Sequence, residues 1–291
     1  TNNSITYQYD TKNSLMKDTA GNIRYYGASP NNYIYFNCSD YSNQSSSTCE
    51  TWRIIGVFNN KVKLIRGSQI GTYAWDNKNT STGAEDNNGK NDWTDARLMK
   101  LLNPGYESET TGGSLYYNAK SGNCYAGDNN ATKACDFTST GIKNDETRGL
   151  ISEETWTLRQ SSDDYANEAY EYERSKGGVY TGRPTEWTGK IALAYPSDYG
   201  YEKCTKRLRS YDDSTCTSNN WMKTIIAPNY GWLLTPYFGC AYFAWYVSLS
   251  GLVTSSTAYR AAGVAPVLYL GSELVVKAGT GSSSVPYQLS A

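Results

Sequence analysis

The chain has 291 residues, of which 38% are hydrophobic, and it carries a formal net charge of −1 with no histidine. A charge this close to zero gives no indication of nucleic acid or an anionic membrane surface as a partner, and no apolar run reaches the ~18 residues of a membrane-spanning helix. The length fits one large β-rich domain. Because 27 Tyr and 8 Trp stand against 5 Phe, we expect a core of amphipathic aromatic side chains.

The first β signals are residues 23–26 and 33–36, two runs of β-forming residues separated by a turn-rich linker. Residues 51–58 and 61–66 follow, on either side of Asn59-Asn60. Two β-rich runs joined by an Asn-Asn turn predict a β-hairpin.

Two or three helices are predicted in the middle of the chain. Residues 92–102 form the first, because they begin with polar capping residues, carry leucines on one face and are followed by a Pro-Gly pair. Residues 106–149 read as loops. A serine followed by two glutamates predicts a helix start at residues 152–159, and residues 162–176 are a further helix prediction that ends at a Gly-Gly pair.

The C-terminal third contains the remaining predicted strands. Residues 189–195 are typical of a buried strand, residues 232–234 are a short apolar run, and residues 263–270 are a strong strand pattern. Residues 274–276 are the last predicted strand, before a Gly/Ser-rich tail. No linker is long enough to divide the chain, so we predict a single domain over residues 1–291.

The seven cysteines group as three couples close in sequence and one single residue: Cys38/Cys49, Cys124/Cys135, Cys204/Cys216 and Cys240. Each couple encloses a polar loop, and loops of this size closed by a disulfide fit an exported protein. We therefore predict three disulfides with Cys240 free. Reduced cytosolic thiols are the alternative. A zinc site is disfavoured because the chain lacks histidine and none of the couples has a CxxC spacing.

Catalytic chemistry finds little support in the sequence. The absence of histidine removes Ser-His and Cys-His nucleophile systems, and no phosphate-binding glycine motif is present. Within residues 237–262, Cys240 has no cation other than Arg260 that could lower its pKa. A structural Ca²⁺ ion is one further interpretation, with oxygen ligands drawn from four acidic residues in a loop-rich region: Asp128, Asp136, Asp145 and Glu146.

Residues 237–262 differ in composition from the rest of the chain. The protein is rich in Asn, Asp, Glu and Lys, yet this segment contains none of these residues, and no Gln or Met either. It is made of Tyr, Phe, Ser, Thr and small residues. Valines and leucines flank Gly251, which predicts a hairpin or a loop-rich ribbon.

Several stretches together resemble a C-type-lectin-fold family that includes formylglycine-generating-enzyme-like domains and the variable proteins of diversity-generating retroelements. The resemblance covers about residues 32–270 and is most specific in the C-terminal block. It is carried, in order, by residues 51–56 with the following hairpin, 93–102, 189–196, Trp232-Leu233-Leu234-Thr235-Pro236 and Gly263-Val264-Ala265-Pro266-Val267-Leu268. The fold that this resemblance implies is an α+β C-type lectin fold with small twisted antiparallel sheets, two or three helices and long loops.

Formylglycine-generating activity is not expected, because it requires a pair of active-site cysteines in this region and only Cys240 is present. The chain also resembles gut-bacterial surface proteins that carry such a domain behind a prepilin-like N-terminal helix. Since the sequence starts at Thr1, we interpret it as a piece of a longer protein, and membrane or pilus attachment is what the resemblance implies for a missing N-terminal segment.

In retroelement-diversified proteins, adenine-directed mutagenesis of codons such as AAY yields many residue types but never Lys, Glu, Gln, Met or Trp. Residues 237–262 obey this exclusion except at Trp245, which we interpret as scaffold. The alternative is an ordinary β-ribbon rich in Ala, Ser and Tyr. A random codon also explains the unpaired Cys240.

We therefore predict a receptor or adhesin on a bacterial cell surface, without catalytic activity, that binds an unknown protein or glycan. The expected contacts are aromatic, arginine, small and polar side chains: Tyr237, Phe238, Cys240, Tyr242, Phe243, Tyr246, Ser248, Ser250, Leu252, Thr254, Ser255, Ser256, Thr257, Tyr259 and Arg260. Most should point to solvent, Phe238, Tyr246 and Tyr259 among them. The frame that holds them is expected to be Trp232, Leu234, Trp245, Val264 and Val267.

Within the predicted domain, residues 1–37 contribute N-terminal strands, residues 232–270 the ligand-binding region, and residues 271–291 a terminal strand and tail. Two alternative functions remain. A sugar-binding lectin would need a Ca²⁺ site with acidic and amide side chains, and residues 237–262 have none. A pilus-associated subunit without a ligand would bury the aromatic segment against a neighbouring subunit.

Overall fold

The computed structural model describes residues 6–160, 164–202, 204 and 206–290. The chain is mixed α+β, and its larger sheet, counted over these residues, has nine strands in the order β1-β2-β3-β5-β6-β18-β10, with β4 also pairing β5 and β13 also pairing β18. These strands are β1 (Gln8–Asp10), β2 (Leu15–Lys17), β3 (Ile23–Tyr25), β4 (Tyr33–Phe36), β5 (Glu50–Phe58), β6 (Lys61–Arg66), β10 (Ile151–Ser152), β13 (Ile191–Ala192) and β18 (Val267–Leu270).

A second sheet has five strands over the described ranges, in the order β16-β15-β14-β17-β7. They are β7 (Thr72–Ala74), β14 (Gly231–Pro236), β15 (Phe243–Val247), β16 (Val253–Thr257) and β17 (Ala261–Gly263). Three two-stranded pairs complete the β structure of the described chain: β8 (Ser121–Tyr125) with β9 (Thr132–Asp136), β11 (Glu154–Thr157) with β12 (Glu186–Gly189), and β19 (Val275–Ala278) with β20 (Gln288–Ser290).

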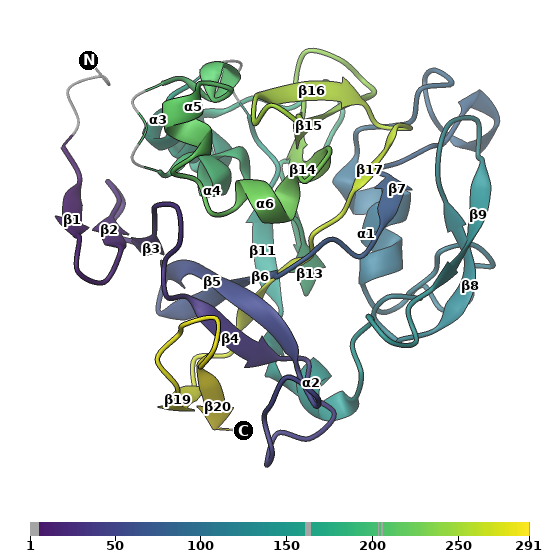
Figure 1. Ribbon diagram of the computed structural model, residues 1–291. Coiled ribbons are helices and arrows are strands. Elements are labelled where there is room, and N and C mark those ends of the chain that lie inside the picture. The colour runs from purple at the N-terminus through teal and green to yellow at the C-terminus, as the bar shows by residue number, and fades with distance from the viewer. Residues whose placement is uncertain (1–5, 161–163, 203, 205, 291) are drawn as a thin grey trace.

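The helices are short and lie between the strands (Figure 1). The α-helices are α1 (Arg97–Leu102), α2 (Asp145–Leu150), α3 (Ala166–Glu171), α4 (Pro196–Gly200), α5 (Ser214–Thr217) and α6 (Lys223–Ile226). Single turns of other helix types are η1 (Thr80–Thr82), η2 (Trp93–Asp95), η3 (Tyr172–Lys176) and η4 (Leu208–Ser210). No helix among the described residues is long and apolar enough to cross a membrane.

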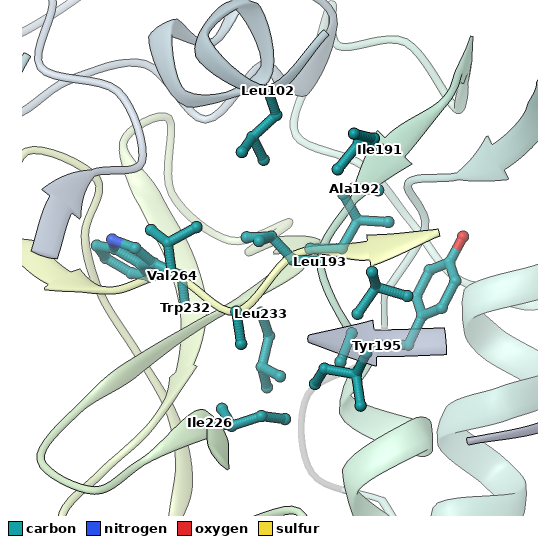
Figure 2. Packing of buried hydrophobic residues seen from close by; sticks show 14 of the residues in the cluster. Leu102, Ile191, Ala192, Leu193, Tyr195, Ile226, Trp232, Leu233 and Val264 are labelled. Carbon is teal, nitrogen blue, oxygen red and sulfur yellow. The ribbon is translucent and has the colours of Figure 1, made fainter. Parts of the chain in front are cut away.

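One hydrophobic cluster contains residues of both sheets. Figure 2 shows part of it: Trp232 of β14 lies beside Val264, Leu233 lies near Ile226 of α6, and Leu193 lies between them and Ile191 of β13 and Leu102 of α1. Five tryptophans are fully buried: Trp52, Trp75, Trp93, Trp156 and Trp232. The prediction of an aromatic core is confirmed. The expected frame residues are all buried as well, with Trp245 the most exposed of them at 3%.

The hairpin predicted around Asn59-Asn60 is confirmed as β5 and β6. Both asparagines have positive φ, 49° and 63°, as a two-residue type I′ turn requires. The strand predictions at 23–26, 33–36, 232–234 and 274–276 correspond to β3, β4, β14 and β19. All three predicted disulfides, Cys38–Cys49, Cys124–Cys135 and Cys204–Cys216, are also formed, and Cys240 is free.

Several local predictions are wrong. Residues 152–159 are not a helix, because β11 pairs with β12 and places Trp156 opposite Trp187. The loop prediction for 106–149 missed β8, β9 and α2. The helix at 92–102 is interrupted at Ala96, whose ψ of 138° is extended. Of the predicted helix 162–176, residues 162 and 163 lie outside the described residues, and the rest is α3 followed by the π-helical turn η3.

Three further differences concern the helices, the strands and the sheets. The described residues contain six α-helices, not the two or three predicted. The predicted strands 189–195 and 263–270 are each broken: only Ile191–Ala192 pairs with β18 in the first, and the second forms β17 and β18. The sheets are neither all small nor all antiparallel, because nine described strands join one sheet and β14 pairs β17 in parallel.

Candidate ligand-binding surface

The 237–262 segment forms the β15–β16 hairpin and the loops on either side of it. β15 pairs antiparallel with β14 and with β16, and β16 is an edge strand of the five-stranded sheet. Gly251 has φ 96° in the turn, where the Ser248 N–H donates to the Leu252 carbonyl. The hairpin predicted around Gly251 is thus confirmed. In Figure 1 it lies at the end of the molecule opposite β19 and β20.

The loop before β15 is held through its main chain by one buried side chain. Asn91 is 0% exposed, and its Nδ2 donates to the carbonyl oxygens of Tyr237, Cys240 and Phe243 at 2.8, 2.6 and 3.0 Å. Its own N–H donates to the Ala241 carbonyl at 2.9 Å. The backbone of residues 237–243 is therefore fixed by contacts that involve none of the loop's side chains.

Arg183 supports the same arrangement from outside the segment. Its Nε donates to Asn91 Oδ1 at 3.1 Å, and its Nη2 donates to the Ala241 carbonyl at 3.1 Å. Nη2 also pairs with Glu85 at 2.9 Å. The guanidinium thus fixes the orientation of the Asn91 amide, so that the NH₂ group points at the loop carbonyls.

The loop after β16 is fixed in the same way by residues 76–89. The N–H of Asp76 donates to the Ala258 carbonyl, and the N–H of Tyr259 donates to the Asn88 carbonyl. Gly89 has φ 88°, and a Cβ there would lie 3.0 Å from the Ala258 Cβ and 2.2 Å from the Asp76 carbonyl. Only glycine permits this close approach, so Gly89 is part of the support.

The aromatic side chains divide between the two faces of the sheet, because successive residues of a strand point to opposite sides. On one face the Tyr237 ring lies 5.6 Å from Phe238, 6.4 Å from Phe243 and 6.1 Å from Trp245, measured between centroids. Tyr242 contacts Phe243 at 5.3 Å. We call Tyr237, Phe238, Tyr242 and Phe243 the aromatic loop cluster.

Tyr246 lies on the other face and corrects the prediction that it points to solvent. It is 9% exposed, and its ring packs between Trp232 at 6.0 Å and Tyr230 at 5.9 Å. Tyr246 is paired directly with Trp232 of β14, so the two rings lie on the same face of the sheet. Tyr230 is 42% exposed, and the Arg260 guanidinium lies 5.9 Å from its ring.

The remaining predicted contacts are spread along the hairpin. Ser255 and Thr257 lie opposite Trp245 and Phe243, whereas Thr254 and Ser256 lie opposite Tyr246 and Ala244. The turn carries an exposed Ser250 with half-buried Ser248 and Leu252. Phe238 and Arg260 are exposed, and half-buried positions are Tyr237, Cys240, Tyr242, Phe243, Thr254, Ser255, Ser256, Thr257 and Tyr259. The structure therefore does not gather all fifteen predicted residues on one face.

Four residues important to this surface were missed by sequence reasoning. Leu249 is 54% exposed at the hairpin turn, and Tyr230 lies just before the segment. Asn91 and Arg183 are distant in sequence, and only the fold brings them to the loop. Tyr230 precedes the predicted strand 232–234, but its exposure is visible only in the structure.

Ionisation on this surface is limited. Arg260 is the one Asp, Glu, Lys or Arg residue in segment 237–262. The charge of a neighbouring Cys240 thiolate, and a hydrogen bond to that side chain, raise the pKa of Tyr242 above its ordinary value. The phenol is therefore neutral at physiological pH and can both donate and accept a hydrogen bond.

The calcium interpretation is not supported by the geometry. Over the described part of the chain, no three His, Cys, Asp or Glu side chains are placed to hold a metal ion. Asp136 accepts hydrogen bonds from Thr138, and Asp145 pairs with Arg148. Asp128, Asp136, Asp145 and Glu146 are thus not brought together.

No protein-family model, curated protein or solved structure matches this chain.

Proposed function

We propose that this chain is a surface-displayed receptor or adhesin with a C-type lectin fold, and that its 237–262 segment is diversified by a retroelement to bind a protein or glycan. The observation that carries the proposal is the support of the segment by Asn91. A main-chain carbonyl is common to every residue type, so hydrogen bonds to it survive substitution of the side chain. This is what a binding surface of variable sequence requires.

The chemistry of the aromatic loop cluster supports the same function. Tyr side chains offer a large contact area with few rotors to immobilise, together with a hydroxyl that forms hydrogen bonds. The cluster lies beside small hydroxyl residues of β16, which can adapt to a ligand. We place the centre of the binding surface at Tyr237, Phe238, Tyr242 and Phe243, with Tyr259 as a further contact.

The disulfides support an extracellular location for the protein. Three bridges among the described residues are typical of an oxidising, extracellular environment. Attachment to a bacterial cell surface or a pilus is part of the proposal and rests on the resemblance stated above.

Tolerance of substitution can be measured with two libraries of matched size. In the first, positions 238, 240, 242 and 259 receive the residue types reachable from AAY codons. In the second, the buried positions 244–247 receive the same set. We expect most members of the first library to resist proteolysis when displayed and most members of the second to be degraded. Equal losses in both libraries would contradict the proposal.

Binding and diversification need separate tests. The wild-type chain and a variant with Phe238→Ser, Tyr242→Ser and Tyr259→Ser can be compared on glycan arrays and arrays of surface proteins. For a receptor, we expect the wild-type chain to bind a ligand and the triple variant not to bind it. For a calcium-dependent lectin, both chains bind sugar and both lose it when calcium is chelated. For a pilus-type subunit, the chain associates with itself through the aromatic loop cluster. An adenine-rich near-copy of the 237–262 coding segment beside a reverse transcriptase gene would establish diversification.

A further inference from the structure

A lysine and an aspartate face each other in the buried interior, outside the candidate surface. Lys63 lies in β6 and Asp198 in α4, 135 residues apart in sequence. The Lys63 Nζ contacts Asp198 Oδ2, and both side chains are 0% exposed. The nitrogen is enclosed by the rings of Phe58, Trp156, Tyr195 and Tyr269, whose centroids lie 4.7 to 5.4 Å away.

The surroundings satisfy an ammonium group poorly. A lysine ammonium has three N–H donors, and within the described residues the hydrogen bond found for Lys63 Nζ is the one to Asp198. The aromatic faces provide cation–π attraction but no lone pairs. An amide nitrogen has a single N–H and no charge, so this enclosure suits an amide better than an ammonium.

Two further groups complete the arrangement. The Arg24 Nη1 lies 3.2 Å from the second aspartate oxygen, Oδ1, and its Nε pairs with Asp18 at 2.7 Å. Glu173 is 1% exposed and accepts hydrogen bonds from the N–H and hydroxyl of Ser197, the residue before Asp198. Arg174 is 3.6 Å from the Glu173 carboxylate.

Burial also brings the lysine toward the neutral form that condensation needs. It lowers the pKa of Lys63 to about 8, against the opposing effect of Asp198. A neutral amine is therefore accessible near neutral pH, whereas Lys63 and Arg24 outweigh the effect of burial and lower the pKa of Asp198, so the proton that this carboxylate needs comes from the Lys63 ammonium.

We propose that Lys63 and Asp198 condense to an intramolecular amide that covalently joins β6 to α4. The ammonium gives up a proton, and the free amine attacks Asp198 Cγ to form the C–N bond. Arg24 stabilises the negative charge that develops on Oδ1, which becomes the amide oxygen. Oδ2 takes the first proton directly from the Lys63 ammonium that it contacts and the second from the same nitrogen after the C–N bond has formed, and it then leaves as water. No oxidant, reductant or other reactant is needed.

The product leaves the buried charges balanced. The reaction removes one cation and one anion, and the groups that remain form the pairs Arg24–Asp18 and Arg174–Glu173. Removing two ions from water costs more free energy than their mutual attraction in the interior returns, unless both are fully hydrogen-bonded. An amide carries no charge and avoids that cost. The crosslink also closes a long loop in the unfolded chain, which lowers its entropy. This inference does not depend on the proposed function.

The mass of the intact chain decides the matter. After denaturation and reduction of all disulfides, the wild-type mass is expected to be lower than the formula mass by one water. Trypsin should then yield a branched peptide in which residues 62–66 are joined to residues 191–203, without cleavage at Lys63. A mass equal to the formula mass overturns the proposal. So does a water loss that fragmentation places elsewhere, such as a succinimide.

Variants provide a matched comparison on one strand. Lys63→Met removes the amine and should restore the full formula mass, as should Asp198→Ala. Lys61→Met is the control, because Lys61 also lies in β6 and pairs with Glu154 in a half-exposed setting; it should retain the water loss. If a Lys63 variant does not fold, the mass of the wild-type chain and its branched peptide still show whether the amide has formed.

Discussion

Replacing Asn91 with alanine should loosen the 237–243 loop and lower the free energy of unfolding. Replacing exposed side chains of the loop itself should not. The substitution removes the Asn91 donor from the carbonyls of Tyr237, Cys240 and Phe243, of which Phe243 still accepts from the Tyr237 N–H. Arg183 Nε loses an acceptor. An unmade buried hydrogen bond costs about 1–3 kcal/mol, and part of the loop can be rehydrated. We therefore expect a loss of about 2–4 kcal/mol in the free energy of unfolding.

Urea denaturation with the disulfides intact measures this loss, and amide hydrogen exchange shows where the structure opens. The matched variant is Phe238→Ser, which changes an exposed side chain of the same loop and should cost no more than about 0.5 kcal/mol. The reasoning is refuted if the alanine variant at position 91 is as stable as wild type, or if exchange in residues 237–243 is unchanged.

Two other outcomes are expected. The variant with Phe238→Ser, Tyr242→Ser and Tyr259→Ser should melt close to wild type and lose binding. Trp245→Ala, at a position that is 3% exposed, should lower the free energy of unfolding by about 3–5 kcal/mol. If calorimetry gives the reverse order of stabilities, the aromatic loop cluster belongs to the core. Because burial raises the folded-state pKa of Glu173 to about 7, stability should fall by roughly 3 kcal/mol as pH rises from about 4.5 to 7. Glu173→Gln should flatten that slope in urea titrations at several pH values, and a parallel slope in the variant would assign it to another group.

Local signals in the sequence predicted the elements whose structure is decided locally. The Asn59-Asn60 turn and its flanking strands need only neighbours in sequence, and each cysteine couple closes a short loop. The 152–159 segment carries a local helix signal as well, but Trp156 is buried at 1% exposure by pairing with β12 some thirty residues later. Long-range pairing of that kind outweighs a helix start that contributes only about 1 kcal/mol.

The candidate surface was predicted in composition but not in geometry. The lack of long charged and amide side chains in residues 237–262 is visible in the sequence alone. Asn91 lies in a polar loop that resembles many others, and nothing local marks it as the support of a distant segment. The division of the aromatic residues between two faces likewise depends on the register of β15, which a ribbon prediction did not specify.

Tyr246 tests this register. If residues 243–247 alternate as the structure has them, Tyr246→Ser removes a ring that contacts Trp232 and Tyr230, and the cavity and lost burial should cost about 2–4 kcal/mol. Tyr242→Ser, four residues earlier, removes a half-buried ring from the loop and should cost less than about 1 kcal/mol. Thermal unfolding of the two single variants gives the comparison directly. If the two variants lose equal stability, or if Tyr242→Ser is the worse, β15 is shifted by one residue and Tyr246, not the loop cluster, belongs to the surface that meets the ligand.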